Sequence, residues 1–284
     1  MILPDFVLPT RIGPPILNYG LDHCPEKNKE HYLNFPYKVE YKFNDRGYRD
    51  TNWPDSLNDL QDAIWCVGDS FTVGLGSPFE HTWPQVLQTR TGCRTINVSM
   101  DGASNEWILR KIKRIVEVIA PKRIVALWSY FHRREDVDIN KIDEDRRIYG
   151  GRSSDSQDYD NFMHCINSTK EYKKITQIQH FTIPDAQSCY EINLAWNAFR
   201  GPDWPKTAPR NSQDFFQLPN FIKLEIIKTF DIDKQFQSLL LRNDQFDEYK
   251  KLENIIEVPQ LDLARDAHHF DIKTSTWLVD QILL

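Results

Sequence analysis

The chain has few cysteines, no long apolar run and no excess of basic residues, and each absence excludes a class of protein. The cysteines are irregularly spaced and form no Cys-x-x-Cys pair. We therefore expect neither a zinc site nor a disulfide framework, and we predict no metal and no cofactor. Cysteines used in this way are typical of a reducing compartment, so a cytoplasmic location is expected. The five are Cys24, Cys66, Cys93, Cys165 and Cys189.

No apolar run approaches the roughly 20 residues that span a bilayer. The first residues lack a basic segment followed by an apolar one, so we expect neither a membrane span nor a secretory signal. With 35 basic and 41 acidic residues the formal net charge is −6, which argues against nucleic acid as a partner. Nothing in the composition indicates an oligomeric state. A length of 284 residues, 40% of them hydrophobic, suits a globular protein with one sizeable core.

A serine-containing turn follows a short apolar run. Residues 64–67 are apolar, Gly68-Asp69-Ser70 follows them, and Gly74 and Gly76 come soon after. The apolar run predicts a buried strand, and the glycines predict a tight turn. A turn at the carboxyl end of a strand is where open α/β sheets keep their sites. Asp69 is expected to order this turn by hydrogen bonding.

A serine becomes a useful nucleophile only beside a base that a third group orients. Near the end of the chain, Asp266 and His269 follow a strand-like run and are three residues apart, so one loop can carry both. His268 is a rival to His269 as the base. Ser70 could instead serve only as a helix cap. A metal site that uses both adjacent histidines is disfavoured, because neighbouring histidines rarely face one metal.

Three ordered segments resemble the motifs of the GDSL, or SGNH, hydrolase superfamily. Gly68-Asp69-Ser70 with the residues up to Gly74 resembles the first motif, residues 97–105 resemble the second, and Asp266-Ala267-His268-His269 resembles the closing Asp-x-x-His motif. The resemblance implies Ser70 as nucleophile, His269 as base and Asp266 as the residue that orients the base. It also implies an oxyanion hole that uses the backbone N–H groups of Ser70 and Gly102, a pair that the need for pre-placed donors also favours.

The third motif of that superfamily departs here. It normally supplies an asparagine as Gly-x-Asn-Asp, but residues 128–135 contain no asparagine. Three alternatives stay open: Ser129 donates in its place, Asn105 turns into the site, or the oxyanion hole has backbone donors alone.

The remaining pattern predicts an α/β fold, a three-layer α/β/α sandwich with a mostly parallel five-stranded sheet of the flavodoxin-like SGNH type. We expect residues 1–63 to form an irregular extension with an edge strand at 37–43, and residues 64–284 to form the hydrolase domain. Insertions are expected at about 132–160 and 190–250. Strands are expected at 64–67, 94–98, 123–128, 174–183 and 255–258, and helices from Glu80 with Thr82 as its cap, at 105–119, at 161–173, within 221–249, and from Asp271 as a cap to 284.

Two basic segments lie outside the motifs. Arg49 ends an Asn-x-x-Gly-Tyr-Arg turn that resembles SGNH-like proteins of bacteria and their phages, which adds association with a phage particle to the expectations. We interpret Arg49 as a surface ion pair rather than a residue of the site. His132, Arg133 and Arg134 are interpreted as a solvated cluster, with binding of an anionic substrate group as the alternative.

Three classes of function fit. The first is an esterase that removes an acetyl or other short acyl group from a small molecule or a glycan. The glycan is suggested by the tryptophans and prolines of residues 190–220. The second is an O-acyltransferase on the same scaffold. The third is a non-catalytic binding or structural module, which the missing asparagine makes conceivable.

Overall fold

The computed structural model describes residues 35, 39–131, 133–134, 155–184, 186, 254–266 and 268–283. The helix predicted within 221–249, most of the insertion at 132–160 and all of the insertion at 190–250 lie outside the described residues. The domain boundary after residue 63 stays a prediction, although Tyr48, Trp53 and Leu60 belong to the same buried core as the sheet.

A five-stranded sheet, entirely parallel, forms the centre of the molecule, with strand order β2-β1-β3-β4-β5. Every residue of β1 is buried, which explains its continuous apolar sequence: a central parallel strand is covered on both faces. The register pairs Gly68 at the end of β1 with Ser99 on one side and Leu127 on the other, so three strands end at the same edge. The strands are β1 Ile64–Gly68, β2 Thr95–Ser99, β3 Arg123–Trp128, β4 Gln177–Thr182 and β5 Ile256–Glu257.

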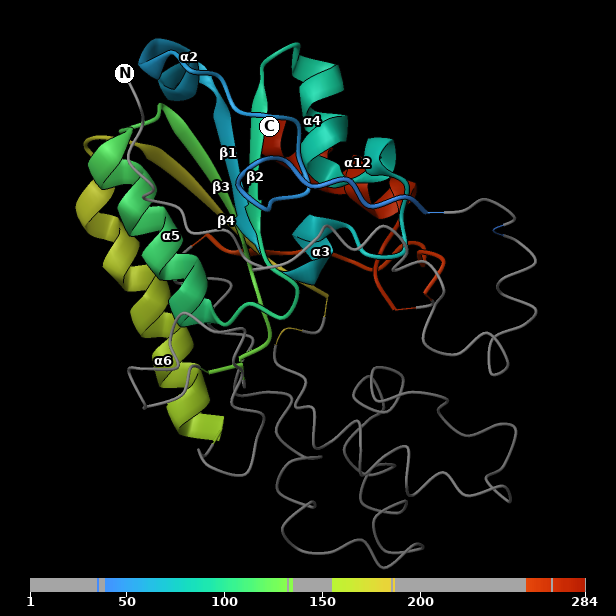
Figure 1. The fold of residues 1–284 in the computed structure, drawn as a ribbon. Helices are drawn as coiled ribbons and strands as arrows, with labels where there is room; N and C mark the ends of the chain where they lie inside the picture. The colour runs from blue at the N-terminus through green and yellow to red at the C-terminus, as the bar shows by residue number, and fades with distance from the viewer. Residues whose placement is uncertain are drawn as a thin grey trace, which may run out of the picture.

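Helices cover both faces of this sheet (Figure 1). Helices α5 (Asn105–Val118) and α6 (Asp155–Ser168) lie on one face, and α4 (Trp83–Thr91) and α12 (Ile272–Leu283) lie together on the other. The predicted three-layer sandwich is therefore confirmed. The apolar stripe read from the sequence of α5 is the face it buries, because residues spaced by three and four share one side of a helix. The buried stripe includes Trp107, Ile108, Ile112, Ile115 and Val116.

The shorter helices are α2 (Leu57–Asp62), α3 (Ser70–Val73), η1 (Phe79–His81) and η3 (Thr169–Tyr172). The helix predicted at 161–173 begins earlier, as α6, and its last residues form η3. Thr82 occupies the predicted N-cap position of α4, but its hydroxyl donates to the Phe79 carbonyl rather than accepting a helix N–H. Within the described residues, no helix combines the length and the apolar character needed to cross a membrane.

Asp271 occupies the predicted N-cap position of α12, where its carbonyl accepts the Ser275 N–H at 3.0 Å. Asp262 accepts the backbone N–H groups of Lys273 and Thr274, at 2.7 and 3.1 Å, and so caps the helix from nine residues before Asp271. The carboxylate of Asp271 instead accepts the Ser77 hydroxyl at 3.0 Å and lies 2.8 Å from His81 Nδ1. Asp262 therefore contributes side-chain acceptors to the start of α12, and Asp271 contributes its backbone carbonyl.

The predicted edge strand at 37–43 is not found in its described part, residues 39–43. The alternation that suggested it is real, because Val39 and Tyr41 are buried, but they pack against Val73 and Leu75 without joining the sheet. The turn after it is present: Asn44 Oδ1 accepts two backbone N–H groups, from residues 46 and 48, each at 3.0 Å. This turn sends the following residue, Arg49, into the interior.

Candidate active site

Ser70 lies where β1 ends and the chain turns into α3. Gly68 is needed here because a Cβ atom would lie 2.1 Å from Thr72 Oγ1 and 2.9 Å from the Leu127 carbonyl oxygen. Asp69 is the N-cap of α3 and its Oδ1 accepts the Phe71 N–H at 3.0 Å, as expected for a residue that orders the turn. Because Asp69 provides the cap, the Ser70 hydroxyl is not needed for that role.

The loop between β5 and α12 brings His269 and Asp266 to this serine. His269 Nε2 lies 2.8 Å from Ser70 Oγ, and His269 Nδ1 lies 2.6 Å from Asp266 Oδ2. Asp266 Oδ1 also accepts the backbone N–H groups of His268 and His269, each at 3.0 Å. The three residues that the sequence predicted together therefore form one continuous chain of hydrogen bonds, in the order needed to take a proton from a hydroxyl.

Asp266 is held in its ionised form. Burial alone would raise its pKa, but the nearby His269 charge and the hydrogen bonds from the His269 ring and from the two loop N–H groups outweigh burial and lower the pKa to about 2. Gly76 allows the loop to approach this carboxylate, since an added Cβ atom would lie 2.8 Å from Asp266 Cγ. Gly76 has a φ of +77°, in the left-handed region that favours glycine.

His268, the rival base, has a different environment. Its ring packs on Phe71 at 5.6 Å between centroids and meets the His269 ring edge-on at 4.7 Å. Although His268 is exposed at the rim, desolvation by the surrounding protein lowers its pKa, the charges of His269 and Arg133 lower it further, and Asp266 opposes them. The hydrogen bond to Ser70 comes from His269, so the geometry favours His269 as the base.

Two backbone positions at the strand ends are the predicted oxyanion donors. Ser70 is the first residue of α3, so its N–H has no acceptor within the helix. Gly102 lies in the turn after β2 with a φ of +69°. The Met100 N–H donates to the Gly68 carbonyl at 3.2 Å, and this bond ties the second turn to the first. Their role as donors stays a prediction.

The two predicted side-chain donors are occupied by other partners. Ser129 Oγ donates to Asp69 Oδ2 at 2.6 Å, which uses its one hydroxyl proton. The Asn105 amide bonds the backbone of the loop after β3: its Oδ1 accepts the Ser129 N–H at 2.9 Å, and its Nδ2 donates to the Tyr130 carbonyl at 3.1 Å. To donate to a reacting carbonyl, Ser129 would have to give up its hydrogen bond to Asp69, and Asn105 would have to give up its bonds to the loop backbone.

No protein-family model matches the chain, and no curated protein matches it. Solved structures do match. The psychrotrophic esterase EstA from Pseudoalteromonas sp. is 14% identical, with 78% of this chain and 94% of that chain covered and a TM-score of 0.40. The structure of TesA is 14% identical over 78% of this chain and 96% of that chain, with a TM-score of 0.39. A GDSL-like lipase from Bacteroides thetaiotaomicron VPI-5482 is 13% identical over 81% of this chain and 90% of that chain, with a TM-score of 0.38.

The chain resembles the GDSL/SGNH hydrolases. The resemblance is carried by its own residues: the Gly68-Asp69-Ser70 turn after β1, the Gly102 turn after β2 and the Asp266 to His269 loop before α12 occur in that order at one edge of a parallel sheet. Matches to solved structures at 13–14% identity say nothing about a substrate.

The segment after β3 that lacks the motif asparagine carries a buried cation. Arg133 is 9% exposed, and its Nη1 donates to Asp69 Oδ2 at 2.8 Å and to Ser129 Oγ at 3.0 Å. The interpretation of Arg133 as solvated is therefore wrong. Arg134 is half-buried and pairs with Glu106 at 2.8 Å and with Asp158 at 3.4 Å. His132 lies outside the described residues.

The interpretation of Arg49 as a surface ion pair is wrong. It is 1% exposed, and its two terminal nitrogens donate to four backbone carbonyls, those of Glu40, Val73, Gly74 and Ser77. Its guanidinium carbon lies 4.4 Å from the centre of the Tyr41 ring, and the Tyr41 hydroxyl accepts the Gly76 N–H at 2.7 Å. Burial lowers the pKa of Arg49 to about 10, against the opposing effects of Tyr41 and Glu80. Arg49 therefore holds the loop that contacts Asp266, and its one sequence signal is the Asn44 turn that precedes it.

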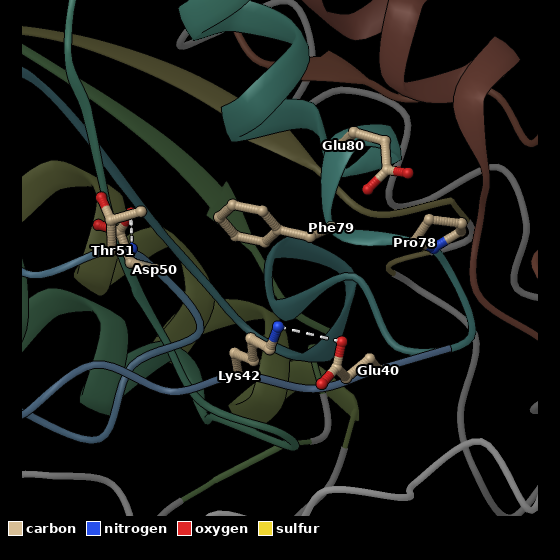
Figure 2. Close-up of a pocket in the computed structure, with 7 residues that line it drawn as sticks. All are labelled: Glu40, Lys42, Asp50, Thr51, Pro78, Phe79 and Glu80. Carbon is tan, nitrogen blue, oxygen red and sulfur yellow. Dashed lines mark hydrogen bonds and ion pairs between the residues drawn. The ribbon is translucent and has the colours of Figure 1, made fainter. Parts of the chain in front are cut away.

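A cavity of about 480 Å³ lies beside this segment (Figure 2). Asp50 in its wall is tied to Arg94 at 2.9 Å, and Lys42 pairs with Glu40 at 3.2 Å. None of the predicted site residues lines it. The lining residues are Glu40, Lys42, Asp50, Thr51, Pro78, Phe79 and Glu80.

Proposed function

We propose that this protein is a serine hydrolase that cleaves an ester by a Ser70–His269–Asp266 mechanism. One observation carries the proposal: the 2.8 Å contact between Ser70 Oγ and His269 Nε2, continued by the 2.6 Å contact between His269 Nδ1 and Asp266. Ser70 and His269 are 2% and 7% exposed, so water competes little for this hydroxyl. An ordinary turn serine needs none of these partners.

The proposed chemistry follows from the geometry. Ser70 Oγ attacks the acyl carbon while His269 Nε2 takes the hydroxyl proton, which requires that Nδ1 carry the other ring proton toward Asp266. The C–O bond to the leaving alcohol then breaks, and His269 returns the proton to the alcohol oxygen. A water molecule repeats the sequence on the acyl-enzyme and releases the acid. Asp266, ionised above about pH 2, stabilises the imidazolium in both halves.

The developing negative charge needs donors that are already in place. We propose the backbone N–H groups of Ser70 and Gly102, each worth about 10²–10³ in rate by analogy with other oxyanion holes. The acyl group proposed is acetyl or another short chain. The proposed alcohol is a carbohydrate, and this rests only on the tryptophans and prolines of residues 190–220, which lie outside the described residues.

The test is hydrolysis of p-nitrophenyl acetate by the wild type, Ser70→Ala, His269→Ala and His268→Ala. We expect Ser70→Ala and His269→Ala each to lose about 10⁴-fold or more in kcat, because members of a triad act as a unit. His268→Ala is the matched control on the same loop and should stay within about tenfold. Circular dichroism of each variant checks that it is folded.

Two results would contradict the proposal. Turnover that survives both Ser70→Ala and His269→Ala would remove the triad. A folded wild type in which no phosphonate ester, small or large, labels Ser70 would favour the non-catalytic module. A labelled serine that turns over only when an acceptor alcohol is added would instead redirect the function to acyl transfer.

A further inference from the structure

Arg133 is a buried cation that uses only part of its hydrogen-bonding capacity. A guanidinium offers five N–H donors on three nitrogens. Within the described residues, both side-chain hydrogen bonds of Arg133 come from Nη1, to Asp69 and Ser129, and its Nε is buried with no acceptor. The unused edge, formed by Nε and Nη2, is the one that grips a carboxylate or phosphate with two parallel hydrogen bonds.

The Arg133 guanidinium is linked to the proposed site by direct contacts. Asp69, which Arg133 binds, directly precedes Ser70 and caps the helix that Ser70 begins. The Arg133 guanidinium carbon lies 4.8 Å from the centre of the Tyr130 ring. Tyr130 in turn meets the Phe71 ring, and Phe71 lies 4.6 Å from the His269 ring between centroids. Arg133 therefore belongs to the same wall of side chains as the proposed base.

Nearby charges support a ligand role over a purely structural one. The charge of Arg133 is one of the causes, after desolvation and His269, that lower the pKa of His268 at the rim of the site. One carboxylate, that of Asp69, balances the cation but contacts a single nitrogen. Unpaired buried donors cost free energy, and a structural arginine such as Arg49 recovers most of it by donating from both terminal nitrogens, which Arg133 does not do.

We propose that Arg133 binds an anionic oxygen group, a carboxylate or a phosphate, carried by the ester substrate next to the bond that Ser70 attacks. The inference rests on the proposed ester hydrolysis and narrows its substrate class to anionic esters. The anion could belong to the acyl group or to the alcohol. Both sources present the same chemistry to the guanidinium.

Two matched pairs of esters distinguish these sources. Mono-p-nitrophenyl succinate and p-nitrophenyl butyrate differ by a carboxylate in the acyl chain. 4-Acetoxybenzoate and its methyl ester differ by a carboxylate on the alcohol. For the wild type we expect kcat/KM to favour the charged member of one pair by at least about tenfold, because a hydrogen-bonded charge contributes that much.

The variants are Arg133→Gln and Arg133→Lys. The control is Arg134→Gln, which removes the neighbouring arginine and its ion pairs with Glu106 and Asp158. Arg133→Gln should raise KM for the preferred charged ester by about 10- to 100-fold and change KM for its neutral twin by less than about threefold. Arg133→Lys keeps a cation beside Asp69 but lacks the planar fork, so it tests the edge even where glutamine unfolds the protein. Arg134→Gln should leave the preference intact.

A loss that is equal for charged and neutral esters would overturn the inference and assign Arg133 to holding Asp69. So would a wild type that prefers neither charged ester. A separate measurement does not depend on turnover: calorimetric titration of inorganic phosphate into Ser70→Ala, with and without Arg133→Lys. If phosphate binds Ser70→Ala and Arg133→Lys abolishes this binding, the anion site is supported even if p-nitrophenyl acetate is not hydrolysed. If phosphate does not bind Ser70→Ala, the anion site is overturned.

Discussion

Two buried arginines flank the proposed nucleophile and use their guanidinium groups differently. Arg49 donates from both terminal nitrogens to four backbone carbonyls, so it joins segments of chain that are distant in sequence. Arg133 donates from one nitrogen to Asp69 and Ser129. Each Nε is buried without an acceptor, but only Arg133 leaves a terminal nitrogen beside it unused.

The difference separates a structural cation from one available to a ligand. Burying a guanidinium is costly unless its charge and donors are satisfied, and Arg49 meets that cost with backbone carbonyls alone. The loop it holds, residues 73–77, also contacts the loop that carries Asp266 and His269, because the Arg265 N–H donates to the Gly76 carbonyl at 3.1 Å. Arg49 therefore acts on the site through the backbone, and we propose that Arg133 acts on it through the unused N–H groups of its own guanidinium.

The sharpest test of this comparison is one substitution made at both positions. Arg49→Lys should lower the free energy of unfolding by about 3 kcal/mol, because one ammonium cannot reach four separate carbonyls. Arg133→Lys should lower it by less than about 1 kcal/mol, because a single cation still faces Asp69. Urea denaturation followed by tryptophan fluorescence measures both, and equal losses would remove the distinction between the two arginines.

The link between the Arg49 loop and the site is tested at two glycines. Gly76→Ala adds a Cβ atom 2.8 Å from Asp266 Cγ at a φ of +77°, so it should displace Asp266 and lower kcat by about 10- to 100-fold. Gly92→Ala is the matched control, with a φ of +68° and nothing within 4 Å of the added atom. It should cost about 1 kcal/mol of backbone strain and leave kcat unchanged.

The contribution of the Asp266 carboxylate to the free energy of unfolding should depend on pH. The pKa of Asp266 falls from 3.8 to about 2 on folding, so its ionised form stabilises the folded state by about 2 kcal/mol at neutral pH. Because the folded pKa is the lower one, this contribution is complete above about pH 4 and is lost as the pH falls toward 2. In urea unfolding between pH 7 and 2.5, Asp266→Asn should lack this part of the decline; parallel curves would contradict it.

An exposed arginine should contribute least to the free energy of unfolding among the arginines compared. Arg90 pairs with Asp280 where α4 meets α12, with side chains 41% and 52% exposed. Solvent screens such pairs, so Arg90→Ala should change the free energy of unfolding by less than about 1 kcal/mol and leave activity unaffected. Thermal unfolding with and without 1 M salt checks this, and a larger loss would mean that burial is not what distinguishes Arg49.

The sequence alone predicted the parts of the molecule that repeat a local pattern. Continuous apolar runs become central parallel strands because both faces of such a strand are covered, and the stripe on α5 becomes its buried face. The contact among Ser70, His269 and Asp266 was also predictable. Ser70 follows a strand-like run, Asp266 and His269 are three residues apart in one loop after another such run, and both segments resemble motifs of one superfamily.

The tertiary structure decided which partner each polar group takes. Ser129 could have donated to a substrate, but the carboxylate of Asp69, sixty positions earlier in the chain, receives its proton. Arg49 could have stayed in solvent, but a turn buries it against the carbonyls of residues 73, 74 and 77. A polar side chain satisfies its hydrogen bonds with whatever the fold brings near, and that proximity is set by packing of distant segments rather than by any pattern a short stretch of sequence contains.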